Sequence, residues 1–176
     1  CVQATPSLFD KSKTLDIVFK WIQKAAKENV KLLVFPESFI PAYPAGLGFG
    51  TVVGSRTEAG REQFREYWEN SVEIGAEETQ QLAKWAKEHD MYITIGVTEK
   101  DSISKTLYCT ILYFSAKGEL MGKHRKLKPT AAERLVWGEG DGTTLSTYDT
   151  KIGKLGGLIC WENYMPLARV AMYQKG

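Results

Sequence analysis

The chain has 176 residues, 43% of them hydrophobic and 25% charged, which is the composition of a globular protein with one domain of ordinary size. Its 23 basic and 21 acidic residues give a net charge of +2, and residues 123–128 (KHRKLK) form the only concentrated basic stretch. A nucleic-acid-binding protein usually has a broader basic footprint, and a membrane span needs an apolar run of about 18 residues that this sequence lacks. We therefore expect neither a nucleic-acid nor a membrane partner.

Helical and extended patterns alternate along the chain. Asp10 can cap a helix, because apolar side chains recur at helical spacing from Leu15 to Ala26. In chain order the sequence predicts a helix to about Asn29, a buried strand over 31–37, a long loop over 41–60, and helices over about 60–70 and 77–89. A strand over 91–100 follows, and then a hairpin over 106–126 that turns near Lys117 and Gly118. An irregular stretch over 125–145 leads to a second hairpin over 144–162, which turns near 151–153. This mixture predicts an α/β layered domain with a mixed sheet.

Cysteine and histidine are too sparse for a metal centre. The chain holds three cysteines and two histidines, which are Cys1, Cys109, Cys160, His89 and His124. Their spacing matches no metal-ligand pattern, so we expect no metal site. Nothing points to secretion, and reduced thiols in a cytoplasmic protein are the expectation. The chain opens on a cysteine and closes after an unfinished helical pattern, so we expect a single domain over residues 1–176, truncated at both ends.

Three chemically active side chains follow predicted strands. Glu37 ends the strand over 31–37, Lys126 ends the first hairpin, and Cys160 ends the second. Strand ends at one edge of a sheet are where α/β proteins assemble sites from distant segments. A nearby ammonium would lower the pKa of a thiol from about 8.5 and favour the nucleophilic thiolate. The carboxylate could take and return protons, and the lysine could stabilise negative charge in the transition state.

Each of these residues alone also has an ordinary explanation. A single cysteine in an apolar run is more often a small core residue, and a loop glutamate or lysine is more often a solvated charge. A papain-like pair of Cys160 with His124 is a second enzymatic possibility. Cys109 lies in an alternating strand pattern, and we expect it to be structural.

Longer segments surround the three residues. They are FPESFIPAYP (35–44), HRKLKPTAAERLVWGEGDG (124–142) and LGGLICWENYMPLARVAMY (155–173). They resemble the three signature blocks of the nitrilase family, in the carbon–nitrogen hydrolase superfamily, and they occur in that family's order over essentially the whole chain. The block around Cys160 is most similar to nitrilases proper, in which tryptophan and glutamate follow the nucleophile. The resemblance implies that the chain forms part of a four-layer α-β-β-α sandwich with mixed sheets.

The resemblance also implies roles for individual residues. Glu37 corresponds to the general base, Cys160 to the nucleophile, and Lys126 to the catalytic lysine because it directly follows His-Arg. Glu133 corresponds to a second glutamate that orients the lysine. Trp161 and Tyr43 are the candidate substrate contacts, while Glu162 and Asn163 are expected to fix the turn after the nucleophile by hydrogen bonds. At Cys109 members of the family often carry asparagine.

The implied activity is hydrolysis of an organic nitrile to a carboxylic acid and ammonia, through a thioimidate and then an acyl-thioester on Cys160, with no cofactor. The partners implied are a small nitrile substrate and further copies of the chain, in dimers or larger spiral assemblies. Cyanide hydration or hydrolysis, or aliphatic amide hydrolysis, is the alternative within the same chemistry. A non-catalytic fragment or assembly subunit is the alternative of another class, because the family's sandwich needs further strands beyond the nucleophile.

Overall fold

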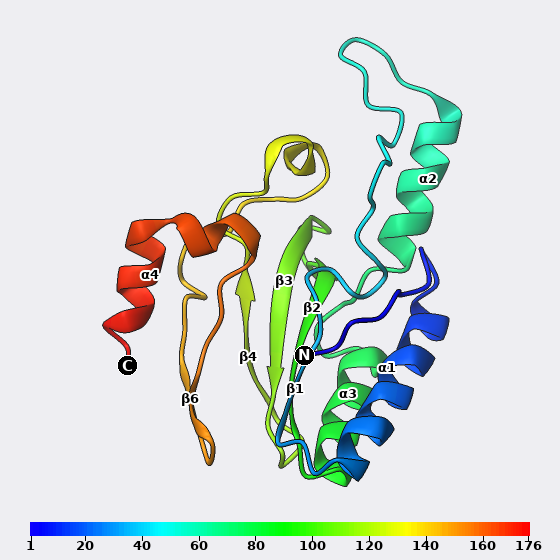
Figure 1. Cartoon of the computed structure of the whole chain (residues 1–176). Coiled ribbons are helices and arrows are strands. Elements are labelled where there is room, and N and C mark those ends of the chain that lie inside the picture. The colour runs from blue at the N-terminus through cyan, green and yellow to red at the C-terminus, as the bar shows by residue number, and fades with distance from the viewer.

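The computed structural model describes residues 1–176, and its elements form four layers (Figure 1). Helices α1 and α3 cover one face of a four-stranded sheet, the β5–β6 hairpin lies over the other face, and α4 lies outside the hairpin. The elements are α1 (Lys11–Lys27), β1 (Leu32–Val34), α2 (Glu58–Glu69), α3 (Glu77–Glu88), β2 (Tyr92–Lys100), β3 (Leu107–Phe114), β4 (Leu120–Arg125), the short helix η1 (Ala131–Leu135), β5 (Tyr148–Thr150), β6 (Gly153–Leu155), the short helix η2 (Cys160–Tyr164) and α4 (Pro166–Tyr173). The layered α/β prediction is confirmed, with the second β layer reduced to one hairpin.

The sheet is mixed, as predicted. Its strand order is β1-β2-β3-β4; β1 runs parallel to β2, and the other neighbours are antiparallel. Asp10 caps α1 by accepting a hydrogen bond from the Lys13 N–H at 2.9 Å. None of the helices combines the length and apolar character required to span a membrane.

One prediction about strand ends is wrong. Cys160 does not end a strand: β6 ends at Leu155, and Cys160 opens η2. β5 and β6 pair over only three residues each. Beyond them, the Ile159 N–H donates its hydrogen bond to the Glu162 carboxylate instead of to a neighbouring strand. Glu37 likewise lies three residues beyond β1, which ends at Val34. Only Lys126 directly follows its strand, β4.

The main core lies between the sheet and helices α1 and α3. Side chains alternate between the two faces of a strand, so Ile93, Ile95 and Val97 of β2 point towards the helices, where they meet residues such as Ile22 of α1 and Leu82 of α3. Each of these side chains is fully buried, and burying one contributes roughly 1.5–3 kcal/mol to folding. The intervening residues of β2 face the opposite side of the sheet, which carries the candidate site.

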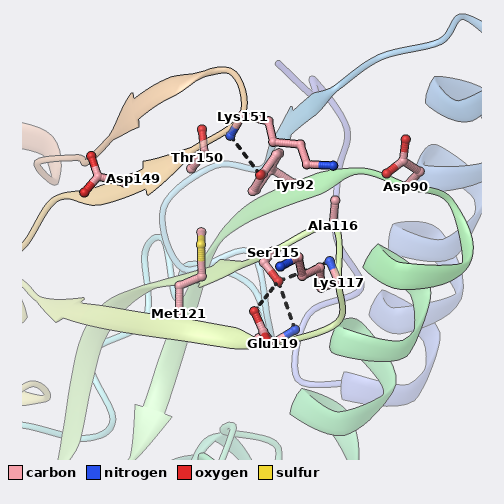
Figure 2. Close-up of a pocket in the computed structure, with 10 residues that line it drawn as sticks. All are labelled: Asp90, Tyr92, Ser115, Ala116, Lys117, Glu119, Met121, Asp149, Thr150 and Lys151. Carbon is pink, nitrogen blue, oxygen red and sulfur yellow. Dashed lines mark hydrogen bonds between the residues drawn. The ribbon is translucent and has the colours of Figure 1, made fainter.

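The β5–β6 hairpin is tied to the far end of this sheet from Lys126. A polar cavity of about 360 Å³ separates the hairpin turn from the starts of β2 and β4 (Figure 2). The Lys151 N–H donates to the Tyr92 hydroxyl at 3.1 Å, and the Ser115 hydroxyl accepts from the Glu119 N–H at 3.2 Å. None of the predicted catalytic residues lines this cavity.

Gly96 of β2 allows the chain after β1 to lie directly on the sheet. A Cβ atom at this position would stand 2.3 Å from the Pro36 carbonyl oxygen and 2.7 Å from the Glu37 Cα. The Phe39 N–H donates to the Gly96 carbonyl at 2.8 Å, which holds the segment in place. The position of Glu37 therefore depends on the absence of a side chain at residue 96.

We predict that Gly96→Ala moves the segment carrying Glu37 and destabilises the protein by about 1–3 kcal/mol, the usual cost of overpacking. Urea denaturation measures the change. Gly48→Ala is the matched control, because a Cβ there meets nothing within 4 Å. Equal stability of the two variants would contradict this explanation of how Glu37 is positioned.

Candidate active site

Lys126 is the centre of the site. It lies one residue after Arg125, so its side chain points to the face opposite that of Arg125, away from the main core. Its ammonium is completely buried and lies 2.8 Å from Glu37 Oε1 and 2.7 Å from Glu133 Oε2. Burial by itself would lower the pKa of Lys126, but the hydrogen bonds to Glu133 and Glu37 outweigh it and raise that pKa above its ordinary value. The amine therefore stays charged.

The neighbouring lysines are engaged elsewhere, which agrees with the choice of Lys126 from its motif position. Lys123 pairs with Glu99 at 2.5 Å, and Lys128 forms an exposed ion pair with Glu139.

Glu133 is held from three sides. Its Oε2 accepts from the Thr130 N–H at 2.6 Å as well as from Lys126, and its Oε1 accepts from the Tyr43 hydroxyl at 2.8 Å. Burial raises the pKa of Glu133, but these donors, Lys126 foremost, outweigh it and lower that pKa below its ordinary value. Because the carboxylate is fully hydrogen-bonded and charged, it can hold the lysine in one position. This geometry agrees with the orienting role expected for Glu133.

Glu37 is contacted by two residues of the sheet region, Lys126 after β4 and Cys109 on β3. Its Oε1 accepts from Lys126 and also lies 3.4 Å from the Cys109 sulfur on β3. The adjacent Ser38 is buried, and its hydroxyl hydrogen-bonds to Thr98 at 2.7 Å, within a network that includes Tyr67. The residue that follows Glu37 is thereby fixed, while a quarter of the Glu37 side chain remains exposed.

Cys160 and Glu37 line the same cavity, which has a volume of about 190 Å³. The walls are mostly apolar, with Phe35, Ile111 and Leu158 among them. Cys160 is exposed and has a φ of +52°. A left-handed conformation at a residue other than glycine costs about 1–3 kcal/mol and persists only where its surroundings enforce it.

Glu162 enforces the turn that carries Cys160. Its completely buried carboxylate accepts from the Ile159 N–H at 2.6 Å, from the Leu127 N–H at 2.6 Å and from His124 Nε2 at 2.9 Å. Ile159 precedes Cys160 and Leu127 follows Lys126, so one carboxylate joins the cysteine turn to the lysine strand. Asn163 adds a bond from its side-chain amide to the Cys160 carbonyl at 2.9 Å. The expectation that Glu162 and Asn163 fix this turn is confirmed.

His124 does not form the papain-like pair. Its Nε2 contacts Glu162, and its Nδ1 lies 3.1 Å from the Thr144 hydroxyl. Both ring nitrogens are therefore engaged within the scaffold. Side chains alternate along β4, so the sequence could have predicted that His124 lies on the same face as Lys126 and supports the site from there.

The two expected substrate contacts lie apart from the small cavity. Tyr43 stands behind Glu133, and its ring meets that of Trp137 edge-on at 5.6 Å. Trp161 is more than half exposed, and its ring packs at 5.1 Å against that of Tyr164. Neither side chain lines the cavity shared by Cys160 and Glu37, so substrate contact by these residues stays a prediction.

A family model described as carbon–nitrogen hydrolase matches residues 1–176. The chain belongs to the carbon–nitrogen hydrolase family.

Among the relatives of this family member is a tobacco (Nicotiana tabacum) protein named bifunctional nitrilase/nitrile hydratase NIT4B. It is 47% identical over 99% of this chain and 50% of its own length. An aliphatic nitrilase from Sinorhizobium fredii is 50% identical over 99% of this chain and 56% of its own length. The solved structure of Saccharomyces cerevisiae Nit3, a nitrilase-superfamily member, superposes with a TM-score of 0.77 at 28% identity, covering 99% of this chain and 59% of the yeast chain. The chain thus spans about half the length of the curated relatives it matches.

We predict that Glu162→Gln destabilises the protein by about 2–4 kcal/mol at pH 7, because three donors converge on a carboxylate that a side-chain amide cannot replace. Burial raises the pKa of Glu162, but the bonds from His124, Leu127 and Ile159 outweigh it and hold that pKa below its ordinary value of 4.5. A depressed pKa stabilises the folded state above pH 4.5, and this stabilisation is lost as the pH falls through the lower folded value.

The difference in thermal midpoint between wild type and Glu162→Gln should therefore be full at pH 7 and shrink below about pH 4.5. Glu139→Gln is the matched control, since Glu139 forms only an exposed pair with Lys128 and should change the midpoint little. A difference that grows on acidification is the result that would refute the assignment.

Proposed function

We propose that the chain carries the catalytic residues of a nitrilase, which hydrolyses an organic nitrile to a carboxylic acid and ammonia. One observation carries the proposal: a buried ammonium joins two carboxylates, and one of these, Glu37, shares a small, mostly apolar cavity with Cys160. A thiol nucleophile, a proton carrier and a fixed positive charge are the groups that addition to a carbon–nitrogen triple bond requires. The names of the tobacco and Sinorhizobium relatives support the same substrate class.

In the first step the Cys160 sulfur attacks the nitrile carbon. Glu37 takes the thiol proton and passes it to the nitrile nitrogen, so that a carbon–sulfur bond forms while one carbon–nitrogen π bond is converted to an N–H bond. The product is a neutral thioimidate. The Lys126 ammonium stabilises the negative charge that develops on nitrogen, and Glu133 keeps the ammonium in place.

In the second step water adds to the thioimidate carbon and loses a proton to Glu37. The tetrahedral species gains a proton on nitrogen and expels ammonia, which leaves an acyl-thioester on Cys160. A second water molecule then releases the carboxylic acid and restores the thiol.

A second product is favoured by one specific observation. The tobacco relative is named for both nitrilase and nitrile hydratase activities. If the tetrahedral species breaks its carbon–sulfur bond before its carbon–nitrogen bond, an amide leaves instead of ammonia. The same cysteine site would then yield both products in a ratio set by which bond breaks first. Cyanide or aliphatic amides are the alternative substrates for this chemistry.

The enzyme is further proposed to act as a homo-oligomer in the cytoplasm. Helix α4 exposes Leu167, Val170 and Tyr173 at a spacing of three residues, and a second copy of the chain would cover these apolar side chains. Its three cysteines are all free thiols, which suits a reducing compartment. Sedimentation analysis tests the assembly.

We predict that a nitrile forms a covalent adduct on Cys160, detectable as an increase in intact mass after acid quenching. Cys160→Ala should fold normally, form no adduct and release no ammonia, whereas Cys1→Ala should behave as the wild type because Cys1 is exposed and lies outside the site.

A panel of aromatic, arylacetic and aliphatic nitriles, with cyanide and aliphatic amides, is assayed for ammonia and amide. No turnover of any nitrile would refute the proposal.

We predict that Glu37→Gln lowers kcat by about 10²–10⁴-fold, the usual contribution of a general base. Glu88→Gln, an exposed position on α3, is the matched control and should leave kcat unchanged. A Glu37→Gln variant with wild-type kcat would exclude Glu37 as the proton carrier.

A further inference from the structure

The two oxygens of the Glu37 carboxylate have different surroundings. Oε1 accepts hydrogen bonds from the Lys126 ammonium at 2.8 Å and from the Cys109 thiol at 3.4 Å. Oε2 has no hydrogen bond to any other residue of the chain. Two donors therefore hold one oxygen and no donor of the chain holds the other, and Glu37 lines the cavity that it shares with Cys160.

Cys109 is fixed in place by the sheet. It lies within β3 opposite Thr98 of β2, and its side chain is almost completely buried on the face that carries the site. Its carbonyl oxygen accepts the Lys126 N–H at 2.8 Å. The same residue thus contacts the lysine through its backbone and Glu37 through its side chain.

The Cys109 thiol acts as a hydrogen-bond donor. Burial raises its pKa well above the ordinary value, and the adjacent negative charge of Glu37 raises it further. The sulfur therefore keeps its proton, unlike a cysteine that serves as nucleophile or metal ligand.

We infer that Cys109 is a positioning residue for Glu37: its neutral thiol, together with the Lys126 ammonium, holds Oε1, so that Oε2 is the oxygen that takes and returns protons. This inference rests on the proposed function and assigns a task to a residue expected from the sequence to be structural. The terminal torsion of a glutamate is soft, and a single donor leaves the carboxylate free to turn about that contact. The second donor removes this freedom.

The expected effect is modest, because a thiol is a weak donor. Cys109→Ala should lower kcat roughly three- to tenfold, with KM unchanged, as the loss of one weak bond to a charged group implies. Cys109→Ser restores a donor and should keep kcat within about twofold of the wild type, on the same grounds. Cys1→Ser is the control and should have no effect, since Cys1 is exposed and lies outside the cavity.

Kinetics are measured with whichever substrate of the nitrile, cyanide and amide panel is turned over, and thermal midpoints are recorded for all variants. A lower kcat in Cys109→Ala than in Cys109→Ser supports positioning, whatever the order of their midpoints. Equal losses in the two variants, or losses confined to KM, would overturn it.

A spectroscopic test does not depend on turnover. In a Cys1→Ser/Cys160→Ala protein the only thiol is Cys109, and its S–H stretching band in the infrared reports the hydrogen bond. Adding Glu37→Gln replaces a charged acceptor with a weaker neutral one and should move the band to higher wavenumber. An unmoved band would overturn the inference. If the band shifts but the wild-type protein, with Cys160 intact, hydrolyses no nitrile, the nitrilase proposal is refuted while the Cys109–Glu37 contact is established.

Discussion

The buried ammonium of Lys126 is the interaction on which the rest of the site depends. Removing a charge from water costs several kcal/mol, and the cost is offset only where partners and geometry compensate. Here two carboxylates from distant segments, Glu37 and Glu133, supply the compensation. Each carboxylate is in turn held by its own donors, Thr130 and Tyr43 on one side and Cys109 on the other. The charge therefore organises the loop after β1, the end of β4 and the short helix η1 around one point.

A third carboxylate, Glu162, is completely buried and holds the turn that carries Cys160, as Glu37 and Glu133 hold the lysine. It accepts backbone N–H groups from both the lysine strand and the cysteine turn, and His124 completes its coordination. An ionised carboxylate can only accept, so it can satisfy several converging donors where an amide would oppose one of them. The strained backbone of Cys160 persists because this bonding over-determines the turn.

Close backbone approaches complete the scaffold. Gly96 permits the segment of Glu37 to lie on β2, and Gly140 lies against the end of β4, where its N–H donates to the Lys126 carbonyl at 2.8 Å. A Cβ atom at Gly140 would stand 2.5 Å from the Arg125 carbonyl oxygen. The glycine-rich stretch over 138–142 thus serves packing around the lysine. Rigid backbone on both sides allows a polar site to keep one arrangement.

The sequence by itself determined the helices, the antiparallel strands and the candidate residues. Helical periodicity, strand alternation and turn residues are local signals, and long motif blocks identified Glu37, Lys126, Glu133 and Cys160 one by one. Only the tertiary structure decided which of them meet: 89 residues separate Glu37 from Lys126, and strand pairing closes that distance. The early end of β6 and the contact of Cys109 with Glu37 also lay beyond the sequence, because hydrogen-bond partners depend on register and on approaches between segments far apart in the chain.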